Sequence, residues 1–392
     1  MKKFRFLKCS VAFTLSLLLA LGTVSSVEAS GVRNNPIAAG QQLAEVIDLI
    51  MTYYVGDPMT VEKLLEAALN GISDVLDEYS GYLTAEEFQR FRDSLTGRMR
   101  GVGITLTVQD DGRVEISNVL PDTPASYAGL RQGDIIISVD NVDVVGASLE
   151  FIRTLIVNPE MDWVLIGVDR AGNTYTFNIE KAEIITPTVI VERLEELPEA
   201  QGLGNVNNFR IMQIISVGAI TAEDVGRALL QMQEEGVEGI VLDLRGNAGG
   251  YVDITMDIAN MLVPHGIVLQ TVNRSGDRYI YSSLLPEVPF NYFVVLVDRF
   301  TASAAEVIAS ALQDSGAAVI VGEPTFGKGS VQSLYSVPTG GAFVLTTEEY
   351  FRRSGETING VGVIPCIEVT SSRQADELDA ALRTGLEILL AK

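Results

Sequence analysis

The chain has 392 residues, 47% of them hydrophobic, and a formal net charge of −23 at pH 7. That acidity argues against nucleic acid or an anionic membrane surface as a partner. The length exceeds a single typical core and predicts about two or three globular domains. No group of His, Cys, Asp and Glu residues has metal-ligand spacing, so we expect neither a metal nor a cofactor.

Residues 1–29 have the three parts of a secretory signal peptide. An apolar segment, Val11–Val24, and a small-x-small cleavage site, Val27-Glu28-Ala29, follow a basic start formed by Lys2, Lys3, Arg5 and Lys8. The apolar segment is shorter than the roughly 20 residues of a membrane-spanning helix. We therefore expect an exported protein that is secreted, periplasmic or associated with the cell envelope, with membrane attachment only if this segment is retained.

Residues 30–97 are predicted to form a helical region, because apolar residues recur at helical spacing in Leu43–Ile50 and Leu64–Leu76. A similar apolar face in Asp376–Leu390 predicts a C-terminal helix within residues 371–392. Both faces can pack on the protein's own core or on a second subunit. The second alternative predicts a homodimer.

Residues 98–182 have the strand and turn pattern of a β-rich domain. Gly101-Val102-Gly103-Ile104 opens a strand, Val114–Val119 alternates, and the turn signal Ala128–Asp134 precedes Ile135–Val139. Consecutive backbone N–H groups in such a glycine loop can hold a carboxylate, and the edge of the following strand can pair with a peptide. A glycine before a strand is, by itself, often only a turn.

Residues 183–370 alternate buried strands with helices, which is the pattern of an α/β domain. The expected strands are Phe209–Ile215, Gly239–Leu244, Phe293–Val297 and Ala317–Val321. The glycine-rich segment Asp243–Gly250 follows the second strand, at the sheet edge where α/β proteins bind ligands. Its backbone N–H groups can approach a reacting carbonyl. A glycine turn that starts a helix is the alternative.

Ser303 is expected at the junction between a strand and a helix, since apolar residues with helical spacing follow it. Backbone N–H groups are unpaired at such a helix start, and the helix dipole favours negative charge there. Lys328 follows after about one more helix and strand, which predicts both side chains at one edge of a parallel sheet. The plainer alternatives are a helix-capping serine and a solvated lysine.

His265, the only histidine, lies in Pro264-His265-Gly266, which we expect to be a surface turn. A serine enzyme with this sequence would therefore use a lysine as its base. Gly322–Lys328 also fits the phosphate-binding pattern G-x-x-x-x-G-K. Gly329, however, replaces the Ser or Thr that the pattern needs, and Pro324 removes a backbone donor. A nucleotide-binding protein is therefore a weaker alternative.

The segments T-A-S-A-A-E-V and G-E-P-T-F-G-K-G-S-V-Q, at 301–307 and 322–332, resemble the carboxyl-terminal processing peptidases. These are serine peptidases with a Ser/Lys dyad and an embedded PDZ domain, and the resemblance runs from about Asp77 to Val369. It implies Ser303 as the nucleophile, Lys328 as the general base and Gln332 as the residue that orients the lysine. We place the oxyanion donors at the Gly250 and Ala304 N–H groups, with Gly249 as the alternative to Gly250.

Residues 98–182 resemble the PDZ domain of this family. The resemblance implies that Gly101, Val102, Gly103 and Ile104 bind the free C-terminus of a protein or peptide substrate. The apolar helix at 149–156 would favour apolar C-terminal residues. The implied activity is that of an extracytoplasmic endopeptidase whose substrates are recognised near their C-termini.

The predicted fold is therefore multidomain, α/β plus α+β. The N-terminal helical arm precedes a β-rich PDZ domain, which is inserted before an α/β peptidase core with a mixed or parallel sheet at 183–370. The sequence departs from the family pattern at Glu78 and Ala248, where proline is usual, at Phe351–Arg353, and at Cys366. A catalytically silent PDZ scaffold remains the other alternative, although Ser303, Lys328 and Gln332 all match.

Overall fold

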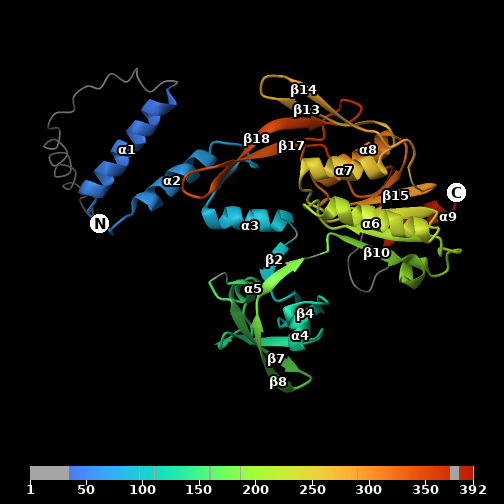
Figure 1. Ribbon diagram of the computed structural model, residues 1–392, viewed down its shortest axis with the longest axis horizontal. Coiled ribbons are helices and arrows are strands. Elements are labelled where there is room, and N and C mark those ends of the chain that lie inside the picture. Colours follow the sequence, from blue (N-terminus) through green and yellow to red (C-terminus); the bar gives the residue numbers. More distant parts are fainter. Residues whose placement is uncertain are drawn as a thin grey trace, which may run out of the picture. The chain divides into compact units, whose positions relative to one another are not determined.

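The structure is a computed structural model that describes residues 35–96, 98–109, 111–158, 160–185, 187–288, 290–370 and 379–391. The chain divides into two compact units, Met1–Ile72 and Ser73–Lys392 (Figure 1). The expected signal peptide at 1–29 and the start of the expected C-terminal helix, residues 376–378, lie outside the described residues.

The first unit contains helix α1, Pro36–Tyr53, and most of helix α2, Val61–Ser73. Asn35 caps α1, because its side-chain oxygen accepts hydrogen bonds from the N–H groups of Ile37 and Ala38. Neither helix buries a residue. In the described part of the chain, no helix is long and apolar enough to cross a membrane.

The second unit begins with strand β1, Gly81–Leu83, and helix α3, Ala85–Thr96. The sequence predicted only helices between residues 30 and 97, and β1 differs from that expectation. The strand pairs antiparallel with strand β18, Ala342–Phe351. Three residues with a partner more than 250 positions away show no local periodicity, so only the folded chain reveals this pairing.

The PDZ region is a β-rich domain with its own apolar core. Its strand order is β3-β4-β5-β7-β8, with β6 paired to β5, and a separate ribbon of β2 and β9 connects it to the rest of the unit. The strands are β2 Arg98–Gly101, β3 Ile104–Val108, β4 Val114–Val119, β5 Ile135–Val139, β6 Val142–Asp143, β7 Trp163–Arg170, β8 Asn173–Glu180 and β9 Ala182–Ile185; the helices are α4 Pro124–Ala128 and α5 Leu149–Val157. Among the described strands, β3 pairs only with β4.

The α/β core, expected at residues 183–370, is built on a six-stranded sheet of order β10-β11-β12-β15-β16-β19. All neighbouring strands run parallel except β10 and β11. The strands are β10 Val189–Arg193, β11 Phe209–Ile214, β12 Gly239–Asp243, β15 Tyr292–Val297, β16 Val319–Gly322 and β19 Ile367–Glu368. The predicted strands are therefore present within about two residues at their ends.

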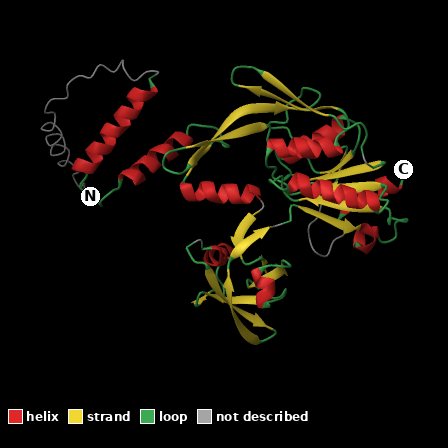
Figure 2. Cartoon of the chain, viewed as in Figure 1, coloured by secondary structure: helices red, strands yellow, loops and turns green. Residues whose placement is uncertain are grey.

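Helices cover both faces of this sheet (Figure 2). Helices α6 Thr221–Glu234, α7 Val252–Leu262 and α8 Ala304–Asp314 pack on one face. Helix α9, Ala380–Leu390, packs on the other face. The short 3-10 turns η1 Leu194–Glu196 and η2 Pro198–Ala200 contribute residues to the same apolar cluster as α9. Side chains of β12 alternate between the two apolar layers, which explains its continuous apolar sequence.

A second, antiparallel sheet completes the core. Its order is β1-β18-β13-β14, and β17 also pairs with β18. Its other strands are β13 Gly266–Asn273, β14 Arg278–Ser283 and β17 Ser330–Ser336. The predicted fold class, a helical arm and a PDZ domain before an α/β core with a mixed sheet, is confirmed.

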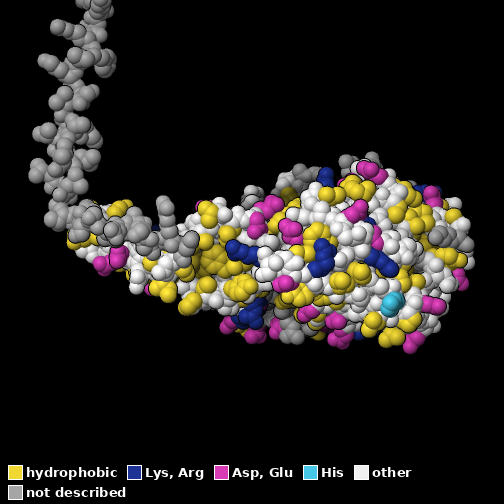
Figure 3. Space-filling view, turned by 90° about the horizontal axis from the view of Figure 1, so that it is seen from above, with side chains coloured by type: hydrophobic (Ala, Val, Ile, Leu, Met, Phe, Trp, Pro, Cys, Tyr) yellow, Lys and Arg dark blue, Asp and Glu magenta, His cyan; other side chains and the backbone are white. Residues whose placement is uncertain are grey.

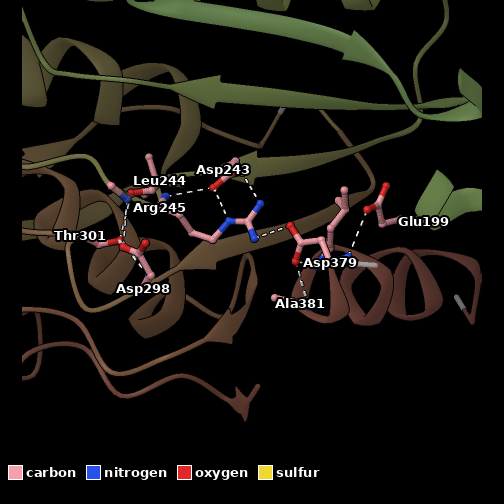
Figure 4. A network of polar contacts seen from close by, with 10 residues as sticks. Glu199, Asp243, Leu244, Arg245, Asp298, Thr301, Asp379 and Ala381 are labelled. Atoms are coloured by element: carbon pink, nitrogen blue, oxygen red, sulfur yellow. Dashed lines mark hydrogen bonds and ion pairs between the residues drawn. The ribbon is translucent and has the colours of Figure 1, made fainter. Parts of the chain in front are cut away.

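A buried ion network joins the end of β12 to the start of α9 (Figure 4). Arg245 donates two hydrogen bonds to the Asp243 carboxylate, at 2.9 and 2.7 Å, and a third to Asp379, at 2.5 Å. Burial acts to lower the pKa of the Arg245 guanidinium, but these two carboxylates raise it above its ordinary value. In the same network, Asp298 accepts the Gly246 N–H at 2.9 Å. The loops after β12 and β15 are thereby held together.

Candidate active site

Ser303 occupies a tight turn between β15 and α8, where it is the N-cap of the helix. Its backbone has φ 54° and ψ −119°, a positive-φ conformation that non-glycine residues rarely adopt. Such strained backbone conformations concentrate at active sites, where the surrounding structure enforces them. The turn therefore fixes the direction in which the Ser303 side chain leaves the sheet edge.

A fully buried carboxylate, that of Glu306, holds the two site segments together. Its Oε2 accepts the N–H groups of Ser303 at 2.8 Å and Lys328 at 2.9 Å. Its Oε1 accepts the Gly327 N–H at 2.7 Å and the Thr325 hydroxyl at 2.5 Å. Sequence reasoning missed this residue, although Ser-x-x-Glu before an apolar helix is the pattern of a capping box and was the available signal.

Lys328 follows β16, which lies parallel and next to β15, the strand before Ser303. The predicted placement of both residues at one sheet edge is therefore observed. The Lys328 Nζ lies 4.9 Å from the centroid of the Tyr79 ring. Burial lowers the pKa of the Lys328 ammonium below its ordinary value, while the charges of Asp77 and Glu306 act to raise it. A lowered pKa is what a lysine that acts as a base requires.

Gln332, on β17, donates from its amide nitrogen to the hydroxyls of Ser330 at 2.8 Å and Thr346 at 3.2 Å. Thr346 in turn donates to the Asp77 carboxylate at 2.9 Å. The amide thus belongs to a hydrogen-bond chain beside Lys328, and its contact with the lysine amine stays a prediction.

The glycine-rich loop after β12 lies directly against Ser303. A Cβ atom on Gly249 would be 2.8 Å from the Ser303 Cβ and 2.9 Å from the Ala304 nitrogen. The Gly249 N–H is already bonded to the Asn247 side chain at 2.8 Å. The N–H groups of Gly250 and Ala304, by contrast, donate to no described residue. This geometry favours Gly250 over Gly249 as the partner of Ala304 in an oxyanion hole.

We expect Gly249→Ala to lower the rate of peptide cleavage by on the order of 100-fold, because the new methyl group displaces Ser303 or fills the oxyanion position. Gly276→Ala is the matched control. Gly276 also has a positive φ, 86° against 96° at Gly249, but nothing lies within 4 Å of its would-be Cβ. Both variants carry the same kind of backbone strain. Equal activities of the two, measured with one peptide substrate, would contradict this account of the loop.

The phosphate-loop alternative for Gly322–Lys328 is wrong. The Gly327 and Lys328 N–H groups, which would have to cradle a phosphate, donate instead to Glu306. Lys328 is also followed by strand β17, whereas a phosphate loop leads into a helix. His265 is exposed in its turn, as expected, and lies at the molecular surface in Figure 3.

A cleft of about 700 Å³ opens beside Lys328. Its lining comes from four separate parts of the second unit: residues 77–79, the segment from Phe326 to Ser330, the sheet residues Thr346 and Glu349, and the loop residues Asn359 and Gly360. Asp77 and Ser80 attach the first of these to β18, since Thr346 hydrogen-bonds to both. In this segment the sequence analysis noted only that the resemblance begins near Asp77 and that Glu78 replaces a proline, and it assigned the segment no role.

In the glycine loop of the PDZ domain, Gly101–Gly103 are buried, and the backbone carbonyls and N–H groups differ in their pairing. The Val102 and Gly103 carbonyls accept hydrogen bonds from Ala125 at 2.8 Å and Leu120 at 2.9 Å. The N–H groups of Val102 and Gly103 have no acceptor among the described residues. Of the predicted groove residues on α5, Ile152 and Ile156 are buried in the domain core, whereas Leu149 and Leu155 are partly buried.

Comparisons with known proteins agree with this architecture. The model of peptidase family S41 matches residues 208–369, and the PDZ domain model matches residues 94–163. A carboxyl-terminal-processing protease of Synechocystis sp. is 30% identical over 321 residues, which cover 81% of this chain and 74% of the relative. The carboxy-terminal processing protease CtpB of Bacillus subtilis is 30% identical over 335 residues, which cover 84% of this chain and 68% of that protein.

A solved structure titled photosystem II D1 C-terminal processing protease is 27% identical, with a TM-score of 0.50 and coverage of 84% of this chain and 92% of that one. The chain therefore belongs to the carboxyl-terminal processing proteases of peptidase family S41.

Proposed function

We propose that this protease is an extracytoplasmic serine endopeptidase in which Ser303 is the nucleophile and Lys328 the general base. The observation that carries the proposal is the shared carboxylate of Glu306. It accepts the backbone N–H groups of both residues, at 2.8 and 2.9 Å, and so fixes their relative position. The apolar segment and cleavage site within residues 1–29 support export.

The reaction requires an unprotonated Lys328 amine. At an ordinary lysine pKa only about one amine in a thousand is neutral at pH 7. Burial lowers this pKa, whereas the ring face of Tyr79 stabilises the charged form. A substrate that enters the cleft removes further water from the amine and favours its neutral form. Lys328 then takes the Ser303 proton, and the serine oxygen attacks the scissile carbonyl to give an acyl-enzyme.

The negative oxygen of the tetrahedral intermediate would be held by the Gly250 and Ala304 N–H groups. Each such donor contributes about 3–4 kcal/mol to the stabilisation of a transition state. Protonated Lys328 would return its proton to the leaving amine, and a water molecule would then hydrolyse the acyl-enzyme. Gln332 would orient the lysine from β17. Apart from the substrate and this water molecule, each step uses a side chain or backbone group named above.

The substrates would be proteins or peptides with free, apolar C-termini, held by Gly101–Ile104. Two observations support this part of the proposal: the Val102 and Gly103 N–H groups have no acceptor in the described part of the chain, and β3 has an open edge among the described strands. They provide donors for a terminal carboxylate and a strand edge for the residues before it.

The test uses an unstructured protein substrate with an apolar C-terminus and the same protein with that terminus amidated. Amidation removes hydrogen bonds to a charged group, worth about 1.5–3 kcal/mol, so kcat/KM should fall by roughly 10- to 100-fold. Gly103→Ala should abolish the difference between the two substrates, because its Cβ would lie 2.4 Å from the Thr123 side chain and distort the loop. Equal rates for both substrates with the parent enzyme would rule out capture of the C-terminal carboxylate.

A silent peptide-binding scaffold would bind the same peptides without reacting. A fluorophosphonate that labels Ser303 in the folded protein separates the two functions, since only an activated serine reacts at a useful rate. Absence of labelling and of cleavage would favour the scaffold.

We further propose that the protein is a homodimer. Of the two apolar helical ends on which the sequence based this expectation, only the N-terminal one, helices α1 and α2, supports it. The apolar side of α9 is covered by the core sheet, as residues such as Leu386 and Leu389 show, so the C-terminal helix packs on its own subunit. Helices α1 and α2, in contrast, leave large apolar side chains such as Ile37, Leu49 and Ile72 exposed. Light scattering should give twice the monomer mass, and a monomer at micromolar concentration would end the proposal.

A further inference from the structure

The amine of Lys328 lies against the ring of Tyr79. The Lys328 side chain is half-buried, and its amine has no hydrogen-bond or ion-pair partner among the residues that the structure describes. Its Nζ is placed over the Tyr79 ring, 4.9 Å from the centroid. An ammonium at this distance is attracted by the negative face of an aromatic ring, more strongly where water is excluded. The ring therefore binds the amine in its protonated form.

The ring has a fixed place because residues 77–80, which we call the tyrosine segment, are fastened to β18. Asp77 is the centre of this attachment: its carboxylate accepts the Tyr79 N–H at 3.0 Å and the Ser80 hydroxyl at 2.8 Å. The same carboxylate accepts the hydroxyl of Thr346, on β18, at 2.9 Å. The Ser80 oxygen in turn accepts the Thr346 N–H at 2.9 Å. Lys328 precedes β17, which pairs with β18, so one sheet holds both the tyrosine segment and Lys328.

Several titratable groups surround Lys328: Asp77 from the tyrosine segment, Glu306 from α8, and Glu349 and Tyr350 from β18. Burial lowers the pKa of the Lys328 amine, and the charges of Asp77 and Glu306 act to raise it. Burial raises the pKa of Tyr350 well above its ordinary value, so this phenol stays neutral. Burial and the neighbouring carboxylates likewise raise the pKa of Tyr79. The face of the Tyr79 ring adds a contact for the charged amine that none of the other groups provides.

We infer that Tyr79 is a positioning residue for the proposed base: the tyrosine segment fixes its ring against the Lys328 amine, and the ring face favours the protonated amine. The inference rests on the proposed Ser303/Lys328 chemistry. In the reaction the Lys328 nitrogen takes the proton of Ser303, while the serine oxygen bonds to the scissile carbonyl carbon. The ring face stabilises the positive charge that this transfer creates. Contact with the ring occupies one side of the amine and no hydrogen bond of Ser303, so the proton transfer remains open.

Fluorination of the ring at position 79 weakens its negative face and changes its shape little. The series starts at Tyr79→Phe and continues with phenylalanines that carry increasing numbers of ring fluorines. Because the protonated amine loses its ring contact, the midpoint of the rise of kcat/KM with pH should move down stepwise, by about 0.4 to 1.5 pH units in all. The plateau rate of fluorophosphonate labelling of Ser303 should fall several-fold, since a weaker base takes the serine proton less readily.

The same series at Tyr82 is the matched control. Tyr82 follows the tyrosine segment on β1, and its ring packs on that of Phe343, with the two centroids 5.8 Å apart. Fluorination there should leave the pH midpoint and the labelling rate at parental values. A downward shift of the same size at both positions would overturn the role of Tyr79 as the ring partner of the amine.

Tyr79→Leu tests the positioning with natural residues, because it removes the ring face and keeps an apolar side chain. Labelling of Ser303 should slow by on the order of 10- to 100-fold, since the amine loses the surface that places it. Tyr79→Phe should recover most of the lost rate, because the ring face returns. Equal labelling rates for the Leu variant and the parent would contradict the inference.

Lys328→Arg separates this inference from the proposed function, because it tests the base and leaves Tyr79 unchanged. Retained cleavage in Lys328→Arg would overturn the dyad, and the role of Tyr79 with it. If Lys328→Arg is inactive and the pH midpoint stays constant across the fluorinated series, only the role of Tyr79 is overturned. A midpoint that moves upward has the same meaning, since a weaker ring face can only disfavour the protonated amine.

Discussion

Lys328→Arg is expected to reduce peptide cleavage by on the order of 10⁴-fold or more, the scale of loss when a member of a catalytic nucleophile-base unit is removed. Arginine keeps the positive charge and much of the length of lysine. Its guanidinium, however, remains protonated at any working pH and cannot accept the Ser303 proton. Circular dichroism and thermal melting should show a retained fold, because the backbone N–H that Glu306 accepts is unchanged.

The matched control is His265→Ala, which removes the only histidine of the chain. That side chain is exposed in its turn, so activity should stay within a few-fold of the parent. An active Lys328→Arg variant, or a folded but inactive His265→Ala variant, would overturn the assignment of the base.

The pH dependence of the parent enzyme gives the same information without a substitution. Below the pKa of Lys328 the amine is protonated and the enzyme inactive, so kcat/KM should rise with pH. Because burial lowers this pKa, the rise should occur below the ordinary lysine value.

Glu306→Gln is expected to impair both activity and stability, because this fully buried carboxylate has four donors to satisfy. A glutamine side chain has one oxygen, and its amide nitrogen would face two of these four donors instead of accepting from them. Buried donors that lose their acceptor cost about 1–3 kcal/mol each, so the free energy of unfolding should fall by roughly 2–6 kcal/mol. Release of the Ser303 and Lys328 backbones should lower kcat by on the order of 100-fold.

Glu368→Gln is the control, since Glu368 is an exposed residue of β19 and surface substitutions of this kind usually change stability by less than about 0.5 kcal/mol. Urea denaturation measures the stability, and fluorophosphonate labelling measures the reactivity of Ser303. Parental stability together with parental labelling in Glu306→Gln would show that the carboxylate does not hold the site.

The strands before Ser303 and Lys328 were predicted from the sequence because both are continuous apolar runs. Parallel strands buried on both faces produce such runs wherever they occur, and their carboxyl ends meet at one sheet edge. The expectation that Ser303 and Lys328 lie together followed from this local information. The contiguous motifs around the two residues identified the family, and the family shares this fold.

The contacts that surround Ser303 and Lys328 were decided by the tertiary structure. Tyr79 reaches Lys328 from the segment before the PDZ domain, and Tyr350 reaches it from β18. Neither contact leaves a periodic signal in the sequence. Tyr79 is far from Lys328 along the chain, and Tyr350 comes close to Lys328 because β18 pairs antiparallel with β17. The choice of Gly250 over Gly249 likewise depended on where the Asn247 side chain points.

The difference between what the sequence predicts and what the tertiary structure adds is clearest at Glu306 and at α9. From the sequence alone, Glu306 is an acidic residue in the first turn of a helix, and α9 is an amphipathic helix. Folding surrounds the carboxylate with donors from the 325–328 loop and places α9 against one face of the core sheet. The sequence by itself indicated the strands and helices of the α/β core and the residues that we propose to carry the chemistry. Only the tertiary structure decided which groups surround them, because hydrogen bonds and packing act between atoms that are close in space, however far apart they lie along the chain.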